Sequence, residues 1–267
     1  MTARILHLSD LHMGHGEAWE PLAALAELIA RLQPELLIVT GDVAHRGKRL
    51  ELEAAATLLE GLGLPLVVVP GNHDIPYTFP ARFTRTFVEW HRVFGETEPS
   101  YASAGVMVAG LNSARAWRQQ GGAVDHEPLA RAAARVEAAP AGALKVVAVH
   151  HHLAAPPWRA ARKLPLSRRD EVLRTLVGAG TELVVSGHVH QASVAERREF
   201  KAIEEGSRRA LVLATAAGLG RPRPKRREEA RGLNVYEADA TTLAVRTFAW
   251  DGIGFGEIGR RSFERGG

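Results

Sequence analysis

Five short apolar segments of this chain each end in a cluster of Asp, His, Asn or Gly residues, and this recurrence constrains the fold more than any other feature of the sequence. The clusters are Asp10-Leu11-His12, Gly41-Asp42, Gly71-Asn72-His73-Asp74, His150-His151-His152 and Gly187-His188-Val189-His190. If the apolar segments are neighbouring strands, their ends meet at one edge of a sheet, where the ligand sites of open α/β sheets lie. The pattern therefore predicts that residues far apart in sequence form one polar site.

Apolar strands alternate with amphipathic helices through most of the chain. Strands are expected at residues 4–9, 35–40, 65–69, 106–111, 144–149 and 182–186. Helices are expected at residues 18–32, 49–61, 82–94, 128–138 and 167–177. Such alternation favours right-handed crossovers and sheets that are covered by helices.

Helical periodicity stops after the last of these strands. Further strands are expected at residues 192–197, 210–214, 233–237 and 243–250, which predicts a second, more antiparallel sheet. Two irregular stretches, 154–165 and 218–232, are rich in proline and basic residues and are expected to be surface loops. No linker divides the chain. The sequence thus predicts an α/β fold of four layers, an α-β-β-α sandwich of two mixed sheets flanked by helices, in a single domain over residues 1–267.

The composition limits which groups of this chain can bind a metal or act as nucleophiles. Cysteine is absent, which excludes disulfides, zinc–thiolate sites, iron–sulfur clusters and cysteine nucleophiles, so nitrogen and oxygen must hold any metal. The sequence contains neither a long apolar run nor a signal-peptide pattern, which predicts a cytoplasmic protein without membrane association. The net charge of +4 is a mild excess that favours an anionic substrate.

The clusters at the strand ends supply imidazole, carboxylate and amide groups, which together suit zinc, iron, manganese, nickel or cobalt. The set is larger than one ion needs. Two ions, about 3.5–4 Å apart and bridged by one carboxylate, would use it fully, and such a pair is suited to phosphoester hydrolysis. Glycines 41, 71 and 187 are expected to allow the tight turns that bring the ligands together.

In order and spacing, the five clusters resemble the five motifs of the calcineurin-like metallophosphoesterases, over residues 4–190. The Leu-Ser-Asp-Leu-His opening at residues 8–12 is most similar to the class III cyclic-nucleotide phosphodiesterases. That subgroup usually has His-His-Pro-Pro after the fourth strand, whereas this chain has His150-His151-His152-Leu153 with Pro156-Pro157 further along. The departure lies where substrate would be contacted, so it bears on specificity more than on catalysis.

The resemblance implies a role for each matching residue. It assigns Asp10, His12 and His190 to one metal ion and Asn72, His150 and His188 to the other, with Asp42 as the bridge. His151 is the alternative to His150. The resemblance implies that His73 does not bind a metal but donates a hydrogen bond to the phosphoryl group or protonates the leaving oxygen. Asp74 is expected to orient the His73 ring. The implied reaction is attack on phosphorus by a hydroxide that bridges the metals.

Substrate contacts are expected from Asn72, His73, Trp158, Arg159 and Arg162, since the loop that holds the last three leaves the strand directly after His150. His15 and His45 are candidates for the mouth of the site, whereas His7, interior to the first strand, is expected to be structural. Five tryptophans, at positions 19, 90, 117, 158 and 250, are expected mainly to pack in the core.

The favoured function is hydrolysis of a cyclic nucleotide or another small phosphodiester. A DNA or RNA nuclease of the repair-exonuclease type, a phosphomonoesterase and a scaffold that lacks catalysis are the alternatives. Nucleic acid is therefore a possible partner that the sequence does not favour. The native metal pair and the oligomeric state stay open, with a dimer among the possibilities.

Overall fold

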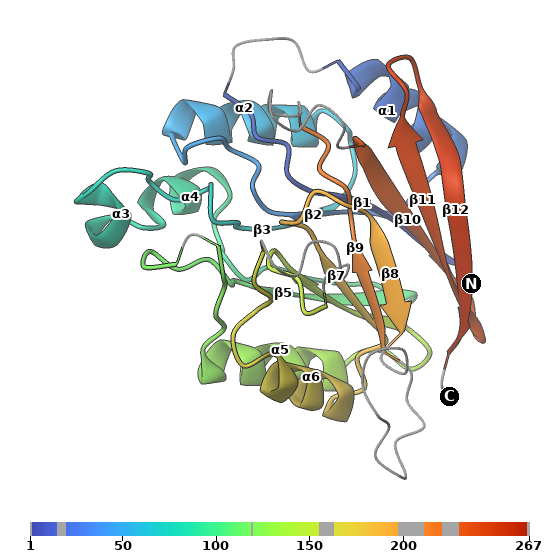
Figure 1. Ribbon diagram of the computed structural model, residues 1–267. Coiled ribbons are helices and arrows are strands. Elements are labelled where there is room, and N and C mark those ends of the chain that lie inside the picture. Colours follow the sequence, from blue (N-terminus) through green and yellow to red (C-terminus); the bar gives the residue numbers. More distant parts are fainter. Residues whose placement is uncertain are drawn as a thin grey trace.

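The computed structural model describes residues 2–14, 20–118, 120–154, 163–196, 211–220 and 230–265. Within these ranges, the strands form two mixed sheets of six strands each. Helices cover the outer face of each sheet, and the sheets face each other between them (Figure 1). The four-layer α-β-β-α architecture expected from the sequence is confirmed.

The first sheet has the strand order β12-β11-β10-β1-β2-β3. Its strands are β1 (Ala3–Leu8), β2 (Leu36–Thr40), β3 (Leu66–Val69), β10 (Gly232–Ala238), β11 (Thr242–Trp250) and β12 (Phe255–Glu264). β1, β2 and β3 are parallel, whereas β10, β11 and β12 continue the sheet with antiparallel pairing. β10, β11 and β12 thus extend the sheet that the early strands begin, and the separate antiparallel sheet expected from the late strands does not form in the described ranges.

The second sheet has the strand order β4-β5-β6-β7-β9-β8. Its strands are β4 (Ser100–Ala102), β5 (Val106–Leu111), β6 (Leu144–Val149), β7 (Leu183–Ser186), β8 (Ser193–Glu196) and β9 (Val212–Thr215). Its four inner strands are parallel, and β4 and β8 pair antiparallel at the edges. Its core strands, like those of the first sheet, are nearly continuous runs of Val, Leu and Ala because both of their faces are buried.

The helices are α1 (Leu22–Leu32), α2 (Arg49–Glu60), α3 (Ala81–Thr84), α4 (Val88–Val93), α5 (His126–Glu137) and α6 (Arg169–Gly178). α1 and α2 pack on the first sheet through apolar residues at helical spacing, such as Leu25, Leu28 and Leu32 of α1. α5 and α6 pack in the same way on the second sheet (Figure 1). No helix in the described ranges combines the length and the apolar character that a membrane crossing requires.

A third apolar cluster lies between the two sheets and is shared by both. It contains Ile5 and Ile38 from the first sheet together with Val108, Val146 and Val185 from the second. The carboxyl ends of β1, β2, β3, β6 and β7 therefore open toward a common region, because the sheets are locked face to face by this core.

The structure corrects some sequence-based expectations. The helix expected at 82–94 is two short helices, α3 and α4, separated by residues 85–87. β4 and β12 were not expected: β4 is very short, and the largely exposed β12 lacks the apolar alternation of a half-buried strand. Trp90 is fully buried as expected, but Trp117 is exposed.

Candidate metal centre

The loops that follow the five strands are hydrogen-bonded directly to one another. The amide N–H of Asp10 donates to the carbonyl of Gly41 at 2.9 Å, and that of His12 donates to the carbonyl of Asp42 at 2.9 Å. In the second sheet, the Gly187 N–H donates to the carbonyl of His150 at 3.0 Å. The His73 N–H donates to Asp42 Oδ1 at 2.8 Å and the His188 N–H donates to Asp10 Oδ2 at 3.0 Å, so the five motifs form one connected framework, as the strand-end pattern predicted.

Asp10, His12 and His190 form the first group of potential ligands. His190 Nε2 lies 3.1 Å from Asp10 Oδ1 and 3.3 Å from His12 Nε2. His12 Nε2 lies 3.8 Å from the same Asp10 oxygen. Asp10 Oδ1 is buried, yet it accepts no hydrogen bond from any described residue. Three donor atoms thus face one another around a position that a cation suits.

Asp42, Asn72, His150 and His188 form the second group. His150 Nε2 lies 3.2 Å from Asn72 Oδ1, 3.4 Å from Asp42 Oδ2 and 3.2 Å from His188 Nδ1. The two groups adjoin, since Asp10, Asp42 and His150 offer ligand atoms within 4.8 Å of one another. All seven residues that the resemblance implied as ligands are therefore brought together.

The far nitrogens of two rings show which tautomers face this second group. His150 Nδ1 donates to the carbonyl of Thr40 at 2.7 Å, and His188 Nε2 donates to the carbonyl of Gln120 at 3.1 Å. In a neutral imidazole the opposite nitrogen then carries a lone pair. When both rings are neutral, two lone pairs and two side-chain oxygens converge here, and carbonyl-anchored imidazoles of this kind are typical metal ligands.

The backbone is held in an uncommon conformation at the same residues. Of the seven non-glycine residues with positive φ in the described ranges, five are predicted ligands. They are Asp10, His12, Asp42, His188 and His190, with φ between 49° and 68°. Left-handed backbone costs about 1–2 kcal/mol per residue and persists at functional sites when the surrounding structure enforces it.

Two glycines are required by close approach to the carboxylates. A Cβ on Gly71 would lie 2.2 Å from Asp42 Oδ1, and a Cβ on Gly187 would lie 1.8 Å from Ser9 Oγ and 2.6 Å from Asp10 Oδ2. Ser9 Oγ itself donates to Asp10 Oδ2 at 2.6 Å. These glycines allow the second-sheet and first-sheet loops to meet around the aspartates.

Burial and neighbouring charges determine which of the imidazoles and carboxyl groups in the two ligand groups are protonated. Burial lowers the pKa of His12 to about 3 and the pKa values of His151 and His188 well below their ordinary value, so these imidazoles are neutral. Burial also opposes charge on His150, but Asp42 outweighs it and raises the pKa of His150 to about 9. His150 in turn holds the pKa of Asp42 well below its usual range, against the effect of burial. A cation at this position would replace the His150 proton.

His151, the alternative to His150, occupies a different environment. Its Nδ1 lies 2.8 Å from Ser113 Oγ, and its ring packs 4.6 Å from the His188 ring between centroids. It shares a potential ligand group with His150 and His188 but with neither aspartate. Its neighbour His152 is buried, with no hydrogen bond from either ring nitrogen to the described residues. The geometry therefore favours His150 as the ligand.

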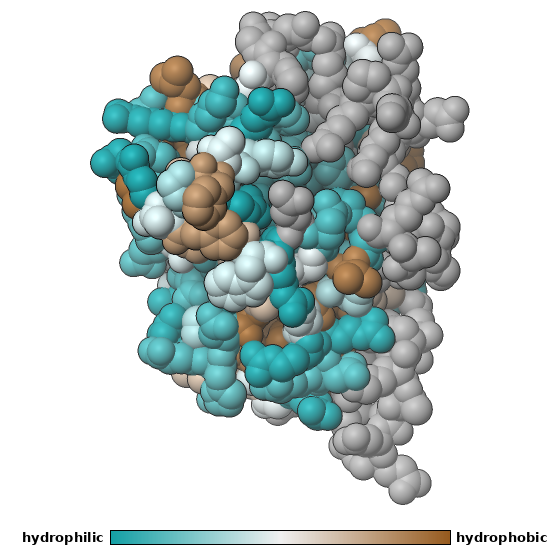
Figure 2. All heavy atoms as spheres, turned by 60° about the vertical axis from the view of Figure 1, so that its left-hand side comes forward, coloured by the Kyte–Doolittle hydropathy of each residue, from teal (hydrophilic) through white to brown (hydrophobic). Residues whose placement is uncertain are grey.

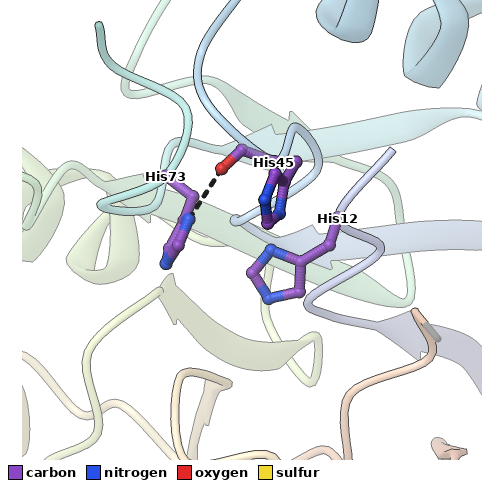
Figure 3. A group of neighbouring side chains, drawn as sticks. All are labelled: His12, His45 and His73. Atoms are coloured by element: carbon purple, nitrogen blue, oxygen red, sulfur yellow. Dashed lines mark hydrogen bonds between the residues drawn. The ribbon is translucent and has the colours of Figure 1, made fainter. Parts of the chain in front are cut away.

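His73 lies beside the first ligand group. Its ring centroid is 4.8 Å from that of His12, and its Nδ1 donates to the carbonyl of His45 at 2.8 Å (Figure 3). The His45 ring itself faces the same space, with its centroid 6.0 Å from His73 and 6.2 Å from His12. The suggestion that His45 lines the mouth of the site thus agrees with its position.

Asp74 has a different environment from the one expected. Its two oxygens accept the backbone N–H groups of Ala44 and Gly71, each at 2.8 Å, and the His73 ring is anchored by the carbonyl of His45 instead. Burial, with the nearby charge of Asp42, raises the pKa of Asp74 to about 7. Asp74 therefore braces the loops after β2 and β3, and the expectation that it orients the His73 ring is not supported by these contacts.

Some expected residues lie outside the described ranges, namely Trp158, Arg159, Arg162 and His15. Sequence reasoning missed the backbone carbonyls of Thr40, His45 and Gln120 as partners of the imidazoles, since no side-chain pattern encodes them. Ser9 could have been found, because it directly precedes the first motif and contacts its aspartate. His7 is structural, as expected, and binds Tyr236 and Thr40 inside the first sheet.

The residues present fit a metal centre. The buried Asp10 oxygen without a donor, the facing lone pairs and the neutral imidazoles are all explained by bound cations, and nitrogen and oxygen donors of this kind suit divalent transition metals.

Parts of the chain are similar in sequence to proteins named as phosphodiesterases. Over 80 residues the chain is 29% identical to a protein of Moraxella catarrhalis named probable cyclic nucleotide phosphodiesterase, covering 28% of this chain and 29% of that protein. Over 65 residues it is 32% identical to the glycerophosphodiester phosphodiesterase GpdQ of Enterobacter lignolyticus, covering 24% of this chain and 22% of that protein. The alignments thus span less than a third of these relatives.

The fold has a solved counterpart in the purple acid phosphatase PPD1 from yellow lupin (Lupinus luteus), with a TM-score of 0.69 at 11% identity over 99% of this chain and 54% of that one. At the level of sequence, the profile of the calcineurin-like phosphoesterases matches residues 3–192, which contain all five motifs. The chain belongs to the calcineurin-like phosphoesterase family.

Proposed function

We propose that this protein is a metal-dependent phosphodiesterase that hydrolyses small phosphodiesters, cyclic nucleotides among them, with two metal ions held in a single-domain fold. The observation that carries the proposal is the second ligand group, in which His188 Nδ1 and the side-chain oxygens of Asn72 and Asp42 lie 3.2–3.4 Å from His150 Nε2. The relatives named as phosphodiesterases support the choice of a diester over a monoester.

Each ion would have its own set of residues. Asp10, His12 and His190 would hold one, and Asn72, His150 and His188 the other, with Asp42 between them. When bound, the two cations would supply the positive charge that lowers the pKa of water and neutralises the phosphoryl oxygens. The protein contributes rigidity, because hydrogen bonds from the backbone of one loop to the backbone or the aspartate of another fix the ligands before substrate arrives.

His73 is positioned to protonate the leaving oxygen or to donate a hydrogen bond to the phosphoryl group. Its backbone N–H donates to Asp42 Oδ1 at 2.8 Å and its Nδ1 donates to the carbonyl of His45, so both the residue and its ring plane are fixed. With Nδ1 committed to that carbonyl, Nε2 is the nitrogen that delivers a proton to the departing oxygen or donates to the phosphoryl group.

A panel of four substrates with added manganese tests the proposal: cyclic AMP, bis(p-nitrophenyl) phosphate, p-nitrophenyl phosphate and single-stranded DNA. We expect the two diesters to have the highest kcat/KM and Asp10→Ala to abolish their hydrolysis. Asp170→Ala, on the exposed side of α6, is the matched control and should hydrolyse both normally. A preference for DNA would show that the protein is a nuclease, and a preference for the monoester would show that it is a phosphomonoesterase. Inactivity on all four substrates would show that it is a scaffold.

A further inference from the structure

Three aromatic side chains are exposed to solvent in the segment that follows the third motif. Tyr77 is 49% exposed, Phe79 83% and Phe83 54%. Figure 2, which brings the α3 side of the molecule forward, shows a brown hydrophobic patch among hydrophilic residues on this face. Large apolar side chains that gather on a surface mark an interaction site more often than scattered ones do. We call Tyr77, Phe79 and Phe83 the aromatic shelf.

Two buried residues, Ile75 and Arg82, anchor the backbone of the aromatic shelf. Ile75, at its start, is fully buried, and Arg82 of α3 is 5% exposed beneath it. Arg82 Nε donates to the carbonyl of Ala116 at 2.7 Å, and Arg82 Nη1 donates to the carbonyl of Pro76 at 3.2 Å. The guanidinium thus ties both ends of the segment to the loop after β5, and the exposed rings project from an anchored backbone.

The aromatic shelf begins beside the candidate metal centre, at Tyr77. The Tyr77 ring lies 5.9 Å from the His73 ring between centroids, with the planes tilted by 41°. Phe79 and Phe83 are 6.3 Å apart with a tilt of 58°. Because neither pair is stacked face to face, these contacts leave ring faces available to a further planar group, at the 4.5–7 Å spacing typical of aromatic pairs.

Resting on the function proposed above, we propose that the aromatic shelf is the subsite for the nucleoside part of a phosphodiester whose phosphorus lies at the metal centre. A nucleobase is planar and stacks on exposed rings regardless of its sequence identity. The tilted rings leave faces on which a planar group can stack, so a nucleoside suits the aromatic shelf better than a hydrocarbon chain does.

The test compares two diesters that release the same p-nitrophenolate: thymidine 5′-(p-nitrophenyl phosphate) and methyl p-nitrophenyl phosphate. Any disturbance of His73 affects both, so the ratio of their KM values isolates the nucleoside. In Tyr77→Ala and Phe79→Ser we expect KM for the thymidine ester to rise roughly 5- to 100-fold relative to the methyl ester. Tyr77→Phe keeps the ring and should retain the wild-type ratio. Ile253→Ser, 89% exposed in the turn between β11 and β12, is the matched control.

The outcomes separate the two proposals. A wild-type protein that hydrolyses neither ester refutes the phosphodiesterase function and the nucleoside subsite with it. Hydrolysis of both esters with an unchanged KM ratio in Tyr77→Ala and Phe79→Ser refutes the subsite alone. A dimer that Phe79→Ser abolishes, again without a change in the KM ratio, would assign the aromatic shelf to a second copy of the chain and also overturn the subsite.

Discussion

Mild acid should destabilise this protein through His7, a histidine that is not among the proposed ligands. The His7 side chain is fully buried in β1, with Nδ1 2.8 Å from Tyr236 Oη and Nε2 2.9 Å from Thr40 Oγ1. Burial lowers the pKa of His7 from 6.5 to about 3, although the charge of Asp10 acts in the opposite direction. The folded protein therefore keeps this ring neutral at pH values where an exposed histidine is protonated.

The direction of this pH effect follows from whether the folded or the unfolded chain binds the proton. Between pH 6.5 and pH 3 the unfolded chain protonates His7 and the folded protein does not, so the free energy of unfolding falls as the pH falls. The stabilisation is complete above pH 6.5. Each pH unit below that value costs about 1.36 kcal/mol, so acidification to about pH 5 should remove about 2 kcal/mol through this residue.

Urea denaturation of wild type and His7→Gln, followed by tryptophan fluorescence with a chelator present, measures this contribution. Glutamine retains hydrogen-bonding groups but does not titrate. The other histidines are common to both proteins, so their effects cancel in the difference between wild type and variant. The free energy of unfolding of wild type minus that of His7→Gln should fall by about 2 kcal/mol between about pH 7.5 and pH 5. A difference that stays constant with pH would refute the assignment of a neutral, buried His7.

Three further predictions concern the candidate centre. His73→Ala should retain its metals but slow hydrolysis by roughly 10²–10⁴-fold, with a smaller loss for nitrophenolate esters than for cyclic AMP; equal losses would indicate phosphate positioning instead of proton donation. Gly187→Ala should weaken manganese binding at least about tenfold, since its Cβ displaces Asp10, whereas Gly178→Ala, with open space around its Cβ, should bind normally in the same titration. Because the pKa of His150 is about 9 in the metal-free protein, manganese binding at about pH 7.5 should release about one proton from this ring, measured by calorimetry in buffers of different ionisation enthalpy. His150→Asn should abolish that release, and a wild-type protein that releases no proton would contradict the assignment.

Much of the fold could be predicted from the sequence because the central strands are apolar on both faces. Val106–Leu111 and Leu144–Val149 were expected at their observed bounds, since a glycine lies within two residues before each strand and a polar residue follows it directly. β12 could not be predicted in the same way. Its residues are almost all exposed, and it is a strand because β11 supplies hydrogen bonds along its length.

The candidate centre was predictable where chemistry is carried by side chains. Asp10, Asp42 and His150 follow apolar strands, and the topology brings them to one place. Backbone partners were not predictable, because any residue can supply a carbonyl, and this is why the His73 ring was expected to meet Asp74 but meets His45. The aromatic shelf was missed for a related reason, since exposed Phe79 and Phe83 resemble core residues in sequence.

The metal content of wild type and Asp42→Ala tests the central claim most directly. A carboxylate that serves both ions is required by both, so its loss removes more than one binding site. Elemental analysis after manganese loading and gel filtration should find about two ions per wild-type chain and far fewer in Asp42→Ala, with diester hydrolysis lost in parallel. An Asp42→Ala protein that retains the wild-type metal content and hydrolyses diesters at the wild-type rate would contradict the account.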